Sequence, residues 1–209
     1  PGHVRKTPFR LRNKNTCHIL NQVYCNMAVQ EKIILGIDPG TSEMGYGLIR
    51  VRGKKMDLLQ LGVIHLKKYV GHELKLKKIF ERVTSIIEEF HPDEMALEAP
   101  FYGKNIQSML KLGRAQGVAM SAALAREIPI TEYAPKKVKQ SVTGNGNASK
   151  EQVAAMLQTL LNMKEIPALL DATDAVGVAV CHHFQKGSQQ RGSASWKSFI
   201  TDNPGRVKK

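Results

Sequence analysis

Cysteine is scarce in this sequence. Cys17, Cys25 and Cys181 form an odd, widely spaced set, which excludes a disulfide framework and a C-x-x-C metal pair. We therefore expect a reducing, cytoplasmic compartment. Long apolar runs are also missing, because none approaches the ~20 residues that a membrane span needs. No continuous apolar segment follows the basic start, so we expect neither a secretory signal nor a membrane partner.

Acidic residues are few. The 209 residues contain 18 Asp and Glu against 31 Lys and Arg, a net charge of +13. Such a surplus favours a polyanionic partner, usually nucleic acid, although excess charge can also serve solubility alone. The hydrophobic fraction of 42% and the charged fraction of 23% are those of an ordinary globular domain.

The two ends differ from the middle of the chain. Residues 1–26 are basic, contain no acid and show no helical or strand period, so we expect a disordered basic extension. It either binds phosphates or lies upstream of an initiator at Met27. We predict one folded domain over residues 31–186, followed by a mobile basic tail over residues 187–209.

The hydrophobic pattern of the middle alternates between strand and helix periods. It predicts strands at 33–37, 44–51, 58–66, 95–97 and 128–133, with a hairpin turn at 53–55. It predicts helices at 72–90 and 105–124, a helix opened by the capping box of Ser149 and Gln152, and a last helix over 171–184. The segment 136–147 is basic and then glycine-rich, and we assign it no regular element. The order predicts an α/β fold: a mixed five-stranded sheet with helices on its faces.

Two acids end predicted strands. Asp38 follows an apolar strand, and Glu98 ends Met95-Ala96-Leu97. If the two strands are parallel neighbours, both acids emerge at the sheet edge where open α/β folds place ligand crevices. The alternatives are a β-turn role for Asp38 in Asp-Pro-Gly and an exposed edge position for Glu98.

Two further acids, Asp171 and Asp174, differ by three positions on the last helix and share one face. Their alternative role is capping, with Asp171 as N-cap. All four acids together offer only hard oxygen ligands, which select Mg²⁺ or Mn²⁺ over zinc. Gathered without cations they would repel one another, and a pair of divalent ions would relieve that repulsion.

Four segments resemble those of the RuvC Holliday-junction resolvases: Gly36-Ile37-Asp38-Pro39-Gly40, Ala96-Leu97-Glu98, Val138-Lys139-Gln140 and Asp171-Ala172-Thr173-Asp174-Ala175. The resemblance covers roughly residues 32–185. It implies an RNase H-like fold, a homodimer, and two Mg²⁺ ions per subunit, or Mn²⁺ in their place, bound by the four acids. It also implies symmetric nicking of four-way junction DNA in recombination and repair, and a branch-migration helicase as partner.

The resemblance assigns roles to other residues as well. Phe101 matches an aromatic that contacts unpaired junction bases, and Tyr102 and Lys104 lie beside it; the alternative for Phe101 is core packing. Lys139 and Lys150 match catalytically important lysines, and their alternative is a solvated basic face. Independently, Lys150 falls in the first turn of a helix, where the helix dipole disfavours a cation. Lys136 and Lys137 are interpreted as phosphate contacts.

Mechanistically, we expect Asp38 to be the ligand shared by both ions and Lys150 to neutralise charge in the transition state. The helix from Asn105, rich in Gly and Ala, is a candidate dimer interface.

Three rival functions remain. An actin-like ATPase would use Asp38 to Thr41 as a phosphate loop, but such folds normally need two related domains. The others are a non-catalytic nucleic-acid-binding protein and an RNase H-like nuclease acting on RNA or hybrids.

Overall fold

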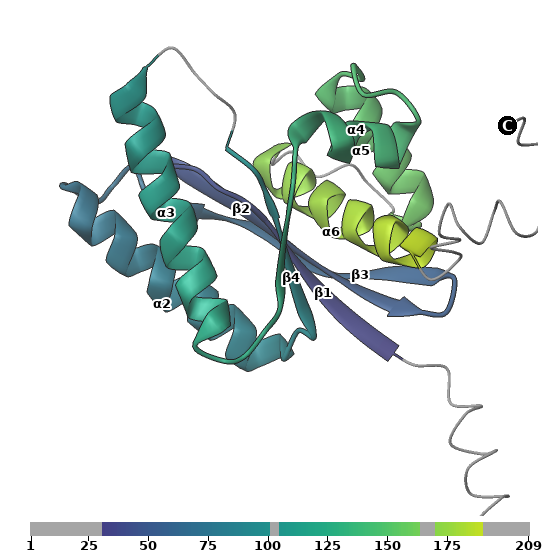
Figure 1. The fold of residues 1–209 in the computed structure, drawn as a ribbon, viewed down its shortest axis with the longest axis horizontal. Helices are drawn as coiled ribbons and strands as arrows, with labels where there is room; N and C mark the ends of the chain where they lie inside the picture. Colours follow the sequence, from purple (N-terminus) through teal and green to yellow (C-terminus); the bar gives the residue numbers. More distant parts are fainter. Residues whose placement is uncertain (1–30, 101–104, 164–169, 190–209) are drawn as a thin grey trace, which may run out of the picture. The chain divides into compact units, whose positions relative to one another are not determined.

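The computed structural model describes residues 31–100, 105–163 and 170–189. Five strands form one mixed sheet in the order β3-β2-β1-β4-β5 (Figure 1). The bounds are β1 Glu31–Asp38, β2 Glu43–Arg52, β3 Lys55–His65, β4 Glu94–Glu98 and β5 Ile130–Tyr133. The predicted five-stranded mixed sheet is therefore confirmed. The tails were predicted at residues 1–26 and 187–209. Residues 1–26 and 190–209 lie outside the described residues, whereas residues 187–189 belong to the last helix, so the prediction was wrong for these three.

The sheet is antiparallel on one side and parallel on the other. β2 pairs antiparallel with both β1 and β3, and the predicted turn at Gly53 and Lys54 joins β2 to β3. Gly53 has a φ of 61°, which a glycine adopts without steric penalty. β4 pairs parallel with β1 and with β5. The carboxyl ends of β1 and β4 consequently lie side by side at one edge.

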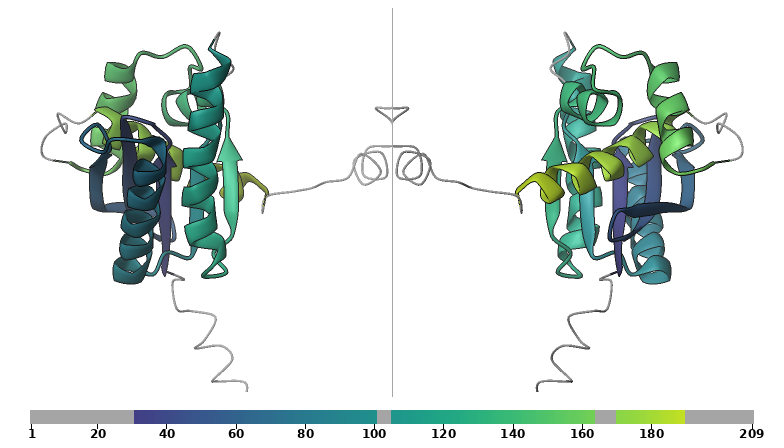
Figure 2. Two further views of the ribbon diagram at one scale, coloured as in Figure 1. Left: turned by 90° about the vertical axis from the view of Figure 1, so that its left-hand side faces the viewer. Right: turned by 90° about the vertical axis from the view of Figure 1, so that its right-hand side faces the viewer.

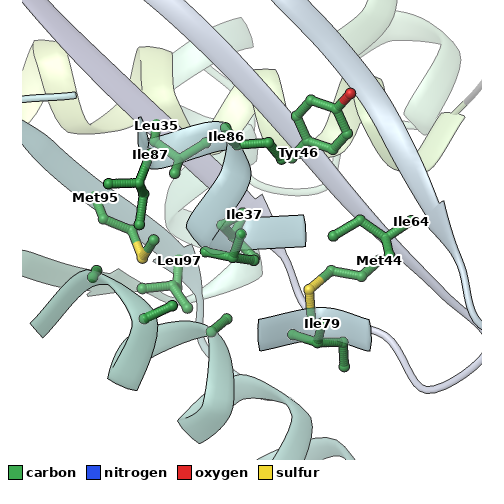
Figure 3. Close-up of a cluster of buried hydrophobic side chains, with 14 of the residues drawn as sticks. Leu35, Ile37, Met44, Tyr46, Ile64, Ile79, Ile86, Ile87, Met95 and Leu97 are labelled. Carbon is green, nitrogen blue, oxygen red and sulfur yellow. The ribbon is translucent and has the colours of Figure 1, made fainter. Parts of the chain in front are cut away.

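Helices cover both faces of the sheet (Figure 2). On one face lie α2 (His72–Phe90) and α3 (Ile106–Leu124); on the other lie α4 (Pro135–Thr143), α5 (Lys150–Leu160) and α6 (Leu170–Gln189). Each face has its own apolar core. Figure 3 shows the first, in which Leu35, Ile37 and Leu97 of the sheet meet Ile79 and Ile86 of α2. Burial of apolar area on both faces is the main force that holds the layers together.

The small residues of α3 divide between two faces. Ala115, Ala119, Ala122 and Ala123 are buried in the core with α2, so the small side chains of this face let the two helices pack closely. Gly113 and Gly117 point elsewhere, because a β-carbon added at either would meet no atom within 4 Å. Asn105 caps the helix by accepting a hydrogen bond from the Ser108 amide.

One helix was not predicted. The basic segment to which we assigned no element forms α4, with Pro135 in its first turn and Gly144 as a left-handed C-cap. Val138 and Val142, one turn apart, are its only two buried residues. They pack against the α5–α6 layer, so tertiary packing overrides a sequence with few apolar residues. The helix carries Lys136, Lys137 and Lys139.

A polar network crosses the sheet near the end opposite to the carboxyl ends of β1 and β4. Glu94 is 7% exposed and accepts hydrogen bonds from His182 Nε2 at 2.6 Å, from Lys32 Nζ at 2.5 Å and from Lys186. The Tyr133 hydroxyl bonds the other ring nitrogen of His182 at 2.8 Å. Burial opposes ionisation of Glu94, but these hydrogen bonds prevail and lower its pKa to about 2. The network ties α6 to β1, β4 and β5.

Within the described residues, no helix combines the length and apolar character that crossing a bilayer requires.

Candidate metal centre

The alternation of β1 and β4 aims two acids at α6. In β1, Leu35 and Ile37 face the α2–α3 core, while Ile34 and Gly36 face α6. Asp38 continues the second set, because side chains alternate along a strand. Glu98 does the same in β4, where Leu97 is paired with Ile37 and Ala96 belongs to the α6 side. Both carboxylates therefore emerge from neighbouring strands on one face.

Glycines let α6 approach the sheet closely enough to bring its acids to that edge. A β-carbon on Gly36 of β1 would collide with the carbonyl oxygen of Ala175, and one on Gly45 of β2 with that of Asp171. The backbone of α6 therefore rests directly on the sheet, in space that any side chain would fill. Since α6 begins at Leu170, Asp171 lies within its first turn and is not the N-cap.

Three of the four predicted acids converge. Ligand oxygens of Asp38, Asp171 and Asp174 all lie within 4.8 Å of one another. Glu98 is not part of that tight group, but it lines the same small cavity of about 120 Å³ together with Asp38 and Asp174. Carboxylates brought this close on two strands and a helix form a set of hard oxygen donors that fits a divalent cation such as Mg²⁺ or Mn²⁺.

The electrostatics of the site fit a cation as well. Burial, followed by repulsion from Glu98, Asp174 and Asp171, raises the pKa of Asp38 to about 8. Burial and repulsion from Asp174 raise the pKa of Glu98 to about 7, against the opposing effects of Lys150 and Lys139. The nearby lysines therefore do not fully offset the negative charge, and a divalent ion would supply the remainder.

Two lysines border the acids. Lys150 is the first residue of α5, as predicted, and the capping box of Ser149 and Gln152 holds that helix end. Its Nζ donates to Asp174 Oδ2 at 2.5 Å and lies 4.0 Å from Asp171 Oδ1. The hydrogen bond to Asp174 raises the pKa of Lys150, so this lysine is a cation at neutral pH. An acidic partner thus offsets the unfavourable position at the helix start.

Lys139 reaches the same cavity from α4, alongside Pro135, Val138 and Val153. The unpredicted helix is therefore the element that presents this lysine to Glu98. Lys136 and Lys137 are exposed on α4 and do not line the cavity. Phe101, Tyr102 and Lys104 lie outside the described residues.

Comparison with known proteins agrees with this arrangement. The sequence profile of the family described as "Crossover junction endodeoxyribonuclease RuvC" matches residues 34–182. A relative of that name from Cytophaga hutchinsonii is 65% identical over 178 residues, which cover 85% of this chain and 89% of the relative.

Solved structures give the same result. The structure of Thermus thermophilus RuvC is 32% identical and superimposes with a TM-score of 0.69 over 75% of this chain and 96% of that one. RuvC from T. thermophilus in complex with a Holliday junction substrate superimposes with a TM-score of 0.70 at 32% identity, over 74% and 94% of the two chains. Yeast mitochondrial Ydc2, 14% identical with a TM-score of 0.58, shares the fold. With this fold, this cluster of acids and these relatives, the chain belongs to the RuvC family of crossover junction endodeoxyribonucleases.

Proposed function

We propose that this protein resolves Holliday junctions by nicking two strands of a four-way DNA junction, in a metal-dependent reaction during recombination and repair in the cytoplasm. The observation that carries the proposal is the convergence of Asp38, Asp171 and Asp174 within 4.8 Å. The family supplies the substrate, since the similar T. thermophilus protein was solved with a Holliday junction. A net charge of +13 suits a polyanionic ligand.

Asp38, Glu98, Asp171 and Asp174 would hold two Mg²⁺ ions per subunit, and the same ligands suit Mn²⁺. At such a site, paired divalent ions supply activation of the attacking water and stabilisation of the leaving oxygen. Asp38 is the best placed acid to serve both ions, because its pKa responds to all three of the others.

The lysines act on the phosphate itself. Lys150, held among the acids at the start of α5, offsets negative charge that develops on the phosphate in the transition state. Lys139 contributes from α4, which lines the same cavity. Lys136 and Lys137 bind the DNA backbone, as does Lys104, and Phe101 and Tyr102 stack on exposed bases. The role of Phe101 rests on the family resemblance, and those of Tyr102 and Lys104 rest on their position beside it in the chain.

We further propose that the protein is a homodimer whose interface includes α3. Ile106, Leu110 and Leu124 are 72%, 53% and 59% exposed. With Gly113, Gly117 and Met120 they recur at alternating spacings of four and three, the stripe of a helix that packs on a second helix. A two-fold dimer presents two centres to two strands. Sedimentation of Leu110→Asp should give a monomer, whereas Gln107→Asp in the same helix should stay dimeric. A branch-migration helicase partner rests on the family alone.

The deciding experiment compares three substrates: four-way junction, linear duplex and RNA–DNA hybrid, each with and without Mg²⁺. Resolution of the junction alone supports the proposal, and preferred cutting of the hybrid would make the protein a different RNase H-like nuclease. Binding without metal-dependent nicking would make it a non-catalytic binding protein.

Asp38→Asn should abolish cleavage and retain junction binding, because binding depends on the basic surface. Asp57→Asn, which removes a half-buried acid of β3 that pairs with Arg52, is the control and should cut normally. A junction resolved by Asp38→Asn at the normal rate would remove Asp38 from the catalytic site.

A further inference from the structure

A second cavity lies on the other face of the sheet, between the N-terminal ends of α2 and α3. It measures about 390 Å³, and its lining includes Thr41, Tyr69, His72, Lys75, Ser108 and Lys111. None of the described residues that line it is acidic, and two are lysines. The cavity is thus polar and cationic, unlike the acid-lined metal centre.

We propose that this cavity binds a phosphate group of the DNA backbone, as an anchor for the strand that runs over the sheet edge from the metal centre. The proposal rests on the junction-binding function above and adds a binding site to it. The bound chemistry is a phosphate oxyanion, and its source is a phosphodiester of the substrate.

Several donors around the cavity suit a phosphate. His72 has a buried Nε2 for which the described residues provide no hydrogen-bond partner. A buried polar atom without a partner is destabilising, and a phosphate oxygen would relieve this by accepting a hydrogen bond. The first turn of α2 also contains one acid, Glu73, whose carboxylate lies beside Gly71, so the attraction for an anion comes from the lysines of the cavity and not from the helix start.

The two lysines are placed to meet the same anion. Lys75 donates from Nζ to the carbonyl oxygen of Thr41 at 3.1 Å, which keeps the ammonium at the cavity and leaves two further protons to donate. It occupies the first turn of α2, where the helix dipole disfavours a cation, and an anion at that point would offset the cost. Lys111 reaches the cavity from α3.

The position of the cavity joins it to the cleavage site. Thr41 follows Asp38 by three residues, and α3 follows β4, which ends at Glu98. Both segments leave the sheet at the edge that carries the acids. Asp38 and Glu98 turn toward α6, whereas the cavity opens on the α2–α3 face. A strand laid across this edge therefore meets the metal centre on one side and the cationic cavity on the other.

The test replaces both lysines and compares the result with a charge-matched control. Lys75→Met/Lys111→Met removes the cations and keeps the apolar stems. Lys54→Met/Lys77→Met removes two exposed lysines from the β2–β3 turn and from α2. Affinity for a fluorescent four-way junction is measured by anisotropy without divalent metal, from low to moderate salt, after circular dichroism confirms that both proteins are folded.

We expect the cavity variant to bind about tenfold more weakly than wild type, because charge-assisted hydrogen bonds to the phosphate are removed. The slope of log affinity against log salt should fall by about one for each phosphate that the protein no longer neutralises. The control pair should change affinity less than about twofold, as surface charges remote from the DNA do. Equal affinity and equal slope for the two variants would overturn the proposal.

Free phosphate is the other source of the same ligand, and a second arm separates the two. Inorganic phosphate is titrated into protein with ¹⁵N-labelled histidine, and the His72 resonance is followed by NMR. A His72 shift with phosphate, combined with unchanged junction affinity in the cavity variant, would overturn the DNA assignment in favour of a small anion. If wild type fails to cut junctions but the cavity variant still binds DNA more weakly, the proposed resolvase function fails and the phosphate site stands.

Discussion

Replacing Gly36 by alanine should disable the site without touching any acid. A β-carbon at this position would overlap the carbonyl oxygen of Ala175 and lie 2.9 Å from the Ala179 nitrogen and 3.0 Å from the Ala179 β-carbon. Carbon atoms in ordinary van der Waals contact are separated by about 3.5 Å or more. The helix α6 must therefore retreat from β1, by roughly half an ångström at Ala179 and more at Ala175.

That retreat acts on the metal centre, because Asp174 directly precedes Ala175 while Asp38 stays on β1. A functional site tolerates displacements of only about 0.5 Å, and 1 Å can reduce the rate on the order of 100-fold. Overpacking should also destabilise the fold by about 1–3 kcal/mol. We expect Gly36→Ala to cut junctions about 100-fold more slowly in single-turnover assays with Mg²⁺ and to unfold at lower denaturant.

The matched control is Gly177→Ala, which adds the same methyl group to α6, the helix that Gly36→Ala displaces. A β-carbon there would lie 3.5 Å from Val138 and 3.7 Å from Leu157, which is ordinary van der Waals distance. The Gly177→Ala variant should cut normally, and its free energy of unfolding should rise by up to about 1 kcal/mol, since alanine favours helix over glycine. Normal cutting and normal stability in Gly36→Ala would refute the close seating of α6 on β1.

Three further predictions concern charge, protonation and capping. Glu94→Gln should destabilise the fold by about 2 kcal/mol at pH 7, because the buried His182 and the partly exposed Lys32 and Lys186 lose their charged acceptor. Since the pKa of Glu94 falls from 4.5 to about 2 on folding, its contribution is complete above pH 4.5 and is lost toward pH 2, so urea unfolding should show the variant and wild type converging in acid. Apparent Mn²⁺ affinity should rise from pH 6 to pH 8, because bound metal requires ionised carboxylates and the pKa values of Asp38 and Glu98 are about 8 and about 7; calorimetry that finds no pH dependence and no proton release would contradict this. Ser149→Ala should lower the free energy of unfolding by about 1 kcal/mol through loss of the capping box, with Thr159→Ala at the far end of α5 as the comparison.

Local signals accounted for most of the secondary structure. The Gly53 turn, the Asn105 cap and the box of Ser149 and Gln152 each depend on interactions within a few residues, so they can be read from the sequence. The helix α4 could not be read in the same way. Its apolar face is only Val138 and Val142, and its stability depends on burial beneath the α5–α6 layer, which no local pattern reveals.

Long-range pairing explains the other differences. Lys32, Glu94 and the pair His182 and Lys186 of α6 are distant from one another in the chain, so the network around Glu94 had no sequence signal. No local pattern in the sequence indicated the partner of Lys150 either. Its place at a helix start was predictable, but its hydrogen bond to Asp174 joins two helices whose packing comes from other residues.

By itself, the sequence determined which acids end the strands, because short apolar runs followed by proline mark the ends of β1 and β4. Only the tertiary structure decided that Asp171 and Asp174 meet them. That meeting depends on how closely α6 approaches the sheet, and three small positions, Gly36, Gly45 and Gly47, govern the distance. Backbone propensity acts over a few residues, whereas the depth of a helix on a sheet is set by volumes contributed from separate strands.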